Sequence, residues 1–102
     1  MNRIDDAMVE ATMRGYDHNN LFAFVAAIIG SDEAQRLMEM YRVGTSKHWH
    51  GATVFWQIAA DNNVRGGKIM LYDRLSGHRV QEPFPHINWV HSVLRLPDFK
   101  LT

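Results

Sequence analysis

Apolar side chains in residues 1–41 recur every three to four positions, the spacing of helices that turn one face toward a core. Residues 5–14 begin with acids and end before Gly15, an order that suits the helix dipole and a glycine stop. Another helix is expected after Ser31, its predicted N-cap, because Leu37 and Tyr41 lie on one face of it. The first part of the chain therefore predicts amphipathic helices.

The most apolar stretch of the chain lies between these two helices. Residues 21–29 are apolar nearly all round. Asn19 or Asn20 can cap a helix that begins there, and Gly30 can end it. Because a helix that is apolar on every side belongs in a core, we predict that this is the most buried helix.

After Val43 the pattern changes to β-branched and aromatic residues. Residues 53–58 and 64–72 are predicted as strands of a hairpin, with Asn62-Asn63 as turn residues that tolerate positive φ angles. Residues 78–80 are expected to return as a short third strand. Residues 87–94 fit a strand that enters a helix, although periodicity does not decide over so short a run.

Two adjacent glycines, Gly66-Gly67, interrupt the second predicted strand, which indicates a bulge or the close approach of another backbone. The whole order predicts one α+β domain of 102 residues, with about three N-terminal helices, a three-stranded antiparallel meander and a short closing element. Its expected parts are an N-terminal helix and loop (1–18), a core (19–96) and a tail (97–102).

Composition narrows the class of protein. The chain has no cysteine, which excludes disulfides, thiolate metal sites and cysteine nucleophiles. Its N-terminus lacks the apolar region of a signal peptide, and its longest apolar run, residues 21–29, is far below the ~20 residues of a membrane span. We therefore expect a cytoplasmic protein with no membrane partner.

Charge is unevenly distributed although the net charge is zero. Residues 1–41 hold three basic and seven acidic side chains, a balance of −4, whereas residues 42–102 hold eight basic and four acidic ones, a balance of +4. Such asymmetry favours a surface that faces a polyanion, while ordinary solvated faces remain an alternative explanation.

Histidines offer one candidate metal site. His48 and His50 form an H-x-H pair, which in a strand would point both imidazoles to one face. A third ligand would have to come from His78, His86 or His91, and no spacing fixes which. Surface or hydrogen-bonded histidines explain the same residues, so no metal is predicted.

No catalytic constellation is complete. The acidic residues occupy predicted helix starts and turns rather than forming a pair, and no serine sits in a G-x-S-x-G elbow. Gly66-Gly67-Lys68 lacks the spacing and the Ser or Thr of a phosphate-binding loop. We therefore expect a protein that is not an enzyme and uses no cofactor.

Basic and aromatic residues occur together in the second half. Single-stranded nucleic acid is bound by basic grooves that follow phosphates and by aromatic rings that stack bases. A Trp-rich core with a charged outer face is the alternative. The candidate nucleic-acid-binding residues on and around the predicted hairpin are Lys47, Trp49, Arg65, Lys68, Arg74 and Arg79.

Several blocks between Asn19 and Leu96 resemble an uncharacterised domain family of Bacteroidetes mobile-element and phage-type proteins. The most specific is V-G-T-S-K-x-W-x-G-A-T-V-F-W-Q-I, residues 43–58. The resemblance implies a neighbouring Toprim-like domain, in cis or in trans.

A looser similarity links residues 41–68 to the N-terminal lobe of bacterial replicative primase cores. It implies that Lys47, Arg65 and Lys68 face a template backbone. The Toprim acids that hold Mg²⁺, and the cysteines of a zinc ribbon, do not occur in these 102 residues.

The expected function is that of a non-catalytic accessory domain of a primase-like mobile-element protein. It would bind single-stranded DNA or RNA without sequence specificity. The alternative is a protein-interaction or homodimerisation module, because the many aromatic and methionine side chains offer anchors and an exposed strand edge can pair with a second copy.

Overall fold

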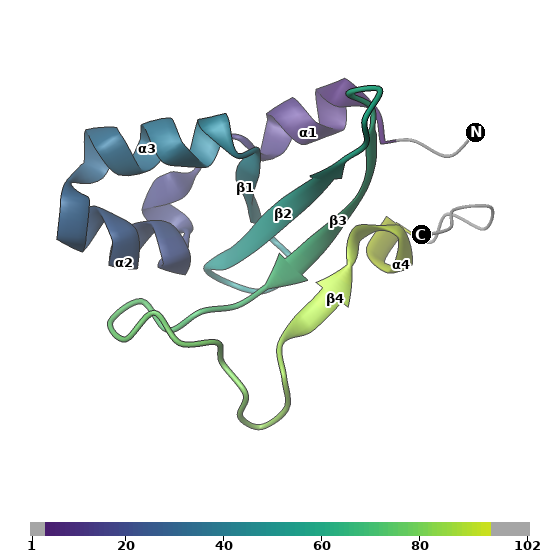
Figure 1. Ribbon diagram of the computed structural model, residues 1–102. Coiled ribbons are helices and arrows are strands. Elements are labelled where there is room, and N and C mark those ends of the chain that lie inside the picture. The colour runs from purple at the N-terminus through teal and green to yellow at the C-terminus, as the bar shows by residue number, and fades with distance from the viewer. Residues whose placement is uncertain (1–3, 95–102) are drawn as a thin grey trace.

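Helices come first and strands second in the computed structural model, which describes residues 4–94 (Figure 1). The order agrees with the predicted α+β class. In sequence, the elements are α1 (Asp6–Thr12), the 3-10 helix η1 (Tyr16–His18), α2 (Asn20–Ile29), α3 (Ser31–Met40), β1 (Val43–Ser46), β2 (Ala52–Ile58), β3 (Val64–Met70), β4 (Ile87–Trp89) and α4 (Val90–Leu94). The tail predicted for residues 97–102 lies outside the described residues.

The sheet has four antiparallel strands in the order β1-β2-β3-β4, so the predicted count of three is wrong. The strand that the pattern missed is β1, whose four residues carry too little alternation to be recognised; pairing with β2, Val43 opposite Phe55, makes it a strand. Residues 78–80 contribute only an isolated bridge, Tyr72 to Arg79. The strand beside β3 is instead β4, which runs directly into α4, as the residues suggested.

Local signals set several element ends as predicted. Asn19 caps α2, because its side chain accepts a hydrogen bond from the backbone N–H of Phe22 at 3.0 Å. Gly30 ends α2 with a φ of 94°, a value that favours glycine. The prediction for Ser31 is wrong: Ser31 is the first residue of α3, and Gly30 occupies the cap position without any side-chain hydrogen bond.

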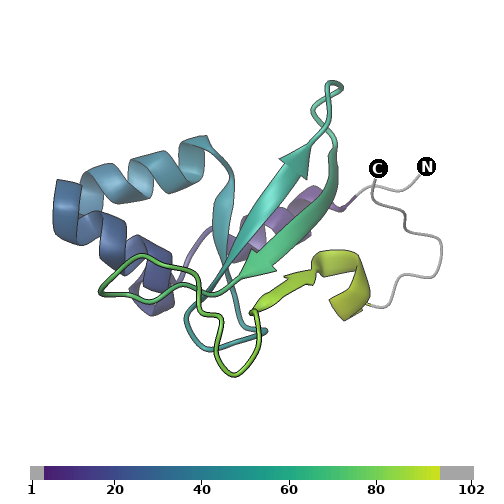
Figure 2. The ribbon, with the colours of Figure 1, turned by 60° about the horizontal axis from the view of Figure 1, so that its bottom comes forward.

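Helix α2 is not the most buried helix, and this prediction is also wrong. None of its residues is buried, and the side chain of Ile28 is 67 % exposed. In Figures 1 and 2, α2 and α3 lie together at one side of the sheet, with no further layer over them. Because the chain is small and has a single sheet, the α2–α3 pair packs against protein on one side only, and the outer side of α2 faces solvent.

Successive side chains of each strand point to opposite faces of the sheet, and they contribute to two separate cores. On one side, α1 and α4 cover a cluster that includes Val54, Trp56 and Ile69. On the other, Val43 packs with Tyr16 beneath the α2–α3 pair. Figure 2 shows α1 passing behind β2 and β3, whereas α2 and α3 lie beside the sheet.

The glycine pair in β3 is explained by side chains rather than by a second backbone. A Cβ on Gly67 would lie 2.8 Å from the Trp56 ring and from Val90, so only glycine lets the indole lie across β3. The predicted bulge is confirmed: Gln57 pairs with Gly66 and Ile58 with Val64, which leaves Arg65, beside the glycine pair, as the extra residue of β3. Within residues 4–94, no helix is long and apolar enough to cross a membrane.

Candidate anion-binding cleft

The structure separates the six residues that were predicted to bind nucleic acid. Lys47 and Trp49 lie together in the loop between β1 and β2, where both line one cleft. The other four, none of which lines that cleft, lie on β3 or between β3 and β4: Arg65, Lys68, Arg74 and Arg79. Of the six predicted residues, the structure therefore brings only Lys47 and Trp49 together in this cleft.

Arg65 is engaged by an acid at the β2–β3 turn. Its guanidinium donates to a carboxylate oxygen of Asp61 at 2.5 Å. The pKa of Asp61 lies below its usual value, first because the backbone N–H of Asn63 donates to it, and also because its side chain accepts from Asn63 and lies beside Arg65. Arg65 would have to leave this pair to contact a phosphate.

The side chains of Lys68 and of the two tryptophans of the sheet, Trp56 and Trp89, also make contacts within the protein. The Lys68 ammonium lies 5.7 Å from the centroid of the Trp89 ring on β4, a cation–π contact. Trp56, on the opposite face, is only 7 % exposed, and its Nε1 donates to Thr12 Oγ1 at 2.9 Å. For Trp56, the core explanation of the aromatic residues therefore holds.

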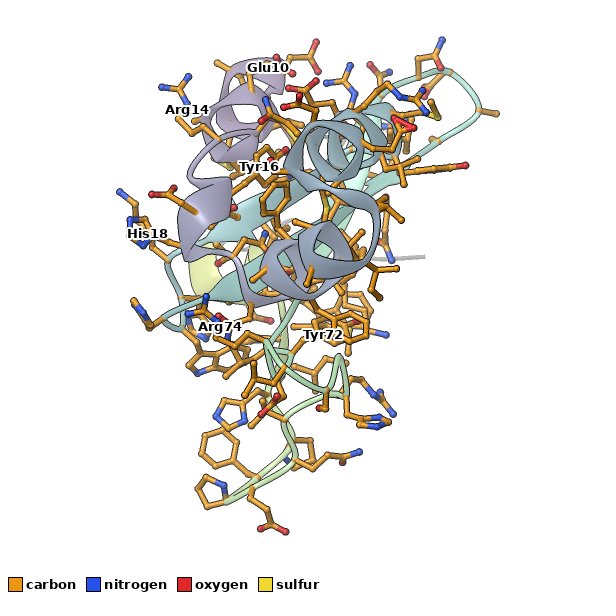
Figure 3. The ribbon with its side chains drawn as sticks, turned by 90° about the vertical axis from the view of Figure 1, so that its left-hand side faces the viewer. Glu10, Arg14, Tyr16, His18, Tyr72 and Arg74 are labelled. Atoms are coloured by element: carbon orange, nitrogen blue, oxygen red, sulfur yellow. The ribbon has the colours of Figure 1, made fainter. Side chains whose placement is uncertain are left out.

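Arg74 and Arg79 occupy an exposed excursion of the chain. The excursion begins with a tight turn in which the Asp73 carboxylate accepts from the backbone N–H groups of Leu75 and Ser76, both at 2.9 Å. These bonds hold the pKa of Asp73 below its usual value. Arg74 follows at the turn, and Figure 3 shows it on the far side of η1 from Arg14.

The cleft itself has a volume of about 630 Å³ and lies between the end of α1, η1 and the β1–β2 loop. Five side chains that can meet an anion or stack on a ring line it: Arg14, His18, Lys47, Trp49 and His50. No Asp or Glu belongs to its lining. Figure 3 shows Arg14, between α1 and η1, and His18, at the end of η1, on the same side of the molecule. The cleft is therefore a cationic hollow.

Backbone geometry brings these distant residues together. Gly15, at a φ of 69°, turns the chain from α1 into η1, which places His18 below Arg14. On the opposite wall the backbone N–H of Asn20 donates to the Gly51 carbonyl at 2.9 Å, and that of Ala52 donates to the Trp49 carbonyl at 3.0 Å. The loop of Lys47 is thus fastened to the start of α2.

The two basic side chains of the cleft, Arg14 and Lys47, are available to bind an anion. In the described part of the chain, neither Arg14 nor Lys47 forms an ion pair, and both side chains are exposed. His18 lies 3.4 Å from Asp17, on the solvent side, and its ring centroid is 6.4 Å from that of His50. An anion that enters therefore meets two unpaired positive charges.

The H-x-H pair does not present two ligands on one face, so that expectation is wrong. His48 and His50 lie in a loop rather than in a strand, and their rings diverge. His48 Nε2 lies 3.2 Å from the side-chain nitrogen of Asn88, whereas His50 lies beside His18. Across residues 4–94, no three histidine or acidic side chains come close enough to hold a metal ion.

A second, apolar recess adjoins the cleft. It has a volume of about 330 Å³, and Lys47 and Ser46 belong to the walls of both hollows. Val54, Trp56 and Ile69 of the sheet line it, together with Met8 of α1 and Val90 of α4. The cationic cleft and this apolar recess are therefore neighbours on either side of Ser46 and Lys47.

Sequence reasoning found Lys47 and Trp49 but missed Arg14, His18 and His50 as members of the same site. Arg14 and His18 come from the acidic half of the chain, where no local pattern indicates that they face the β1–β2 loop. The weak signals in the sequence were a basic residue, Arg14, directly before a glycine stop, and the high histidine content. Their convergence follows from the packing of α1 on the sheet.

Comparison with known proteins places most of this fold in one family. The profile of a family described as Domain of unknown function (DUF6371) matches residues 19–102. No curated protein and no solved structure matches the chain. The match begins at Asn19, the cap of α2, so Arg14 and His18 precede the matched residues.

Proposed function

The chain belongs to the DUF6371 family, and from the geometry above we propose that it binds single-stranded nucleic acid, DNA or RNA, through its phosphates at the cationic cleft. The observation that carries the proposal is the pair Arg14 and Lys47, which face one hollow without a carboxylate in its lining. Contacts to phosphates are independent of base sequence, so the binding is non-specific. The domain is a non-catalytic accessory part of a primase-like mobile-element or phage protein.

Physical chemistry favours a phosphate chain over a single small anion. Arginine and lysine supply several donors to phosphate oxygens, and the imidazoles of His18 and His50 can add donors beside them. Trp49, half-buried at the same cleft, offers a ring on which a base can stack. Cations and an aromatic side chain in one groove are the combination that single strands require.

A partner that carries the catalytic chemistry completes the proposal. The resemblance of residues 43–58 to a mobile-element family supports a Toprim-like domain as that partner, in cis or in trans. In such an assembly the present domain would hold the strand near a polymerising site without contributing a catalytic group.

The direct test is the salt dependence of oligonucleotide binding. We expect fluorescence anisotropy with a labelled oligodeoxythymidine to give an affinity that falls with salt, and the variant R14A/K47A to flatten the slope by about 1.4, since each phosphate contact contributes ~0.7. The matched control is R65A/R74A, which removes two positive charges outside the cleft and should leave the slope near that of the wild type. An R14A/K47A slope equal to that of the wild type would refute the cleft as the binding site.

Exposed apolar side chains support a second candidate, a homodimerisation or protein-interaction module. Ile28 and Ile29 at the end of α2, and Met40 and Tyr41 at the end of α3, are all exposed. Light scattering tests it: a dimer that the variant I28K/I29K converts to a monomer, with no affinity for oligonucleotide, would favour this function over the first.

A further inference from the structure

We propose that the apolar recess beside the cleft receives one nucleobase, while Lys47 on the shared wall holds the phosphate joined to it. The unit that the domain recognises is then a nucleotide within the strand, inserted with its base inward. This inference rests on the proposed function, because the recess opens beside the cationic cleft and shares Lys47 with it.

The size and the lining of the recess suit a base. Its volume of about 330 Å³ lies at the lower end of the ~300–1,000 Å³ typical of small-molecule pockets. Val54 and Ile69 lie at the base of the recess and are only 1 % and 3 % exposed, so the accessible apolar wall comes mainly from α1, where Met8 provides a flexible side chain that adapts to a planar ring. A nucleobase has apolar faces that gain from leaving water against such a surface.

Trp56 contributes a carbon surface rather than a polar one. Its indole N–H already donates to Thr12 Oγ1 at 2.9 Å, so the ring has no unused donor in the recess. Thr12 in turn donates its hydroxyl to the Val9 carbonyl at 2.7 Å. The Trp56 indole and the Thr12 hydroxyl therefore have no donor left to read the edge of a base, so these two side chains give no preference for one base over another.

The positive charge next to the recess distinguishes a nucleotide from other amphipathic anions. A fatty acid or a single carboxylate would need one cation, which Lys47 alone supplies. The cleft continues past Lys47 to Arg14, His18 and His50, a distribution that fits the successive phosphates of a chain. The combination of one apolar recess and an extended cationic cleft therefore matches a strand with one base turned inward.

The test compares two oligonucleotides of equal length with the full chain: oligodeoxythymidine, and an abasic strand that keeps every phosphate. We expect the abasic strand to bind at least about 5-fold more weakly, the loss that corresponds to one stacked base. Both strands should share the salt slope, because they carry the same charge.

A variant that fills the recess separates this loss from general weakening. Met8 lines the recess but not the cationic cleft, so M8W should remove the part of the preference that comes from the inserted base, keep the part that comes from a base stacked on Trp49, and leave the salt slope intact. M40W is the matched control, since Met40 is exposed at the end of α3. Circular dichroism melting confirms that both variants fold.

The outcomes distinguish insertion of a base into the recess from the proposed binding of phosphates at the cleft. If the abasic strand binds as tightly as oligodeoxythymidine with a normal salt slope, or if M8W keeps the full preference of the wild type for bases, the recess does not hold a base and the phosphate-binding function stands. If neither strand binds, the proposed function fails and this inference falls with it. A preference for bases that M8W reduces and M40W retains in full supports the insertion of one base.

Discussion

Replacing Asn19 by alanine removes a buried side-chain amide whose four hydrogen bonds join α2 to two strands. Oδ1 accepts from the backbone N–H of Phe22 at 3.0 Å and from Thr53 Oγ1 at 2.9 Å. Nδ2 donates to the Gly44 carbonyl and to Thr45 Oγ1, both at 3.1 Å. The residue is only 1 % exposed, so water cannot readily take over these bonds.

The expected cost follows from what the alanine leaves behind. Loss of an N-cap destabilises a helix by about 1 kcal/mol. The Thr53 hydroxyl and the Gly44 carbonyl then lose a partner in a buried setting, at about 1–3 kcal/mol for each group left unsatisfied. We therefore expect N19A to lower the free energy of unfolding by about 3–7 kcal/mol, a large part of the ~5–15 kcal/mol of a typical domain.

Urea unfolding followed by tryptophan fluorescence measures this loss. The matched comparison is N20A, because Asn20 is the next residue and its side chain makes one recorded hydrogen bond, to the Tyr72 carbonyl at 3.0 Å, in a half-buried position. We expect about 1 kcal/mol for N20A. An N19A variant that loses no more stability than N20A would show that the network does not hold α2 to the sheet.

Three further changes probe other contacts. G67A places a methyl group against Trp56 and should cost about 1–3 kcal/mol in chemical unfolding; an unchanged midpoint would contradict the close packing. T12V leaves the Trp56 N–H without its acceptor, so we expect a loss of about 1–3 kcal/mol, whereas equal stability would mean that water replaces the hydroxyl. Burial, with smaller contributions from the Glu39 and Glu10 carboxylates, raises the pKa of Tyr16 to about 12. The unfolded chain ionises first, near its ordinary pKa of 10, so stability present below pH 10 should fall by about 2–3 kcal/mol as the pH rises toward 12, and Y16F should abolish this part of the decline.

Local sequence signals determined the elements of this fold. Asn19 caps α2 and Gly30 ends it, because each acts on backbone groups within a few residues. Asn62, at a φ of 65°, forms the expected turn between β2 and β3. The α+β class follows from the order of helical and strand spacing. These features depend on near neighbours in the chain, which the sequence displays directly.

Tertiary contacts decided the rest. The four residues of β1 become a strand only because β2 pairs with them, and α2 is exposed because a small sheet covers one side of the helix pair. Arg14 and Lys47 meet across the cleft because α1 packs on the sheet behind β1. Long-range packing decides which basic side chains pair with an acid and which line the same hollow. The spacing of residues along the chain does not reveal this packing.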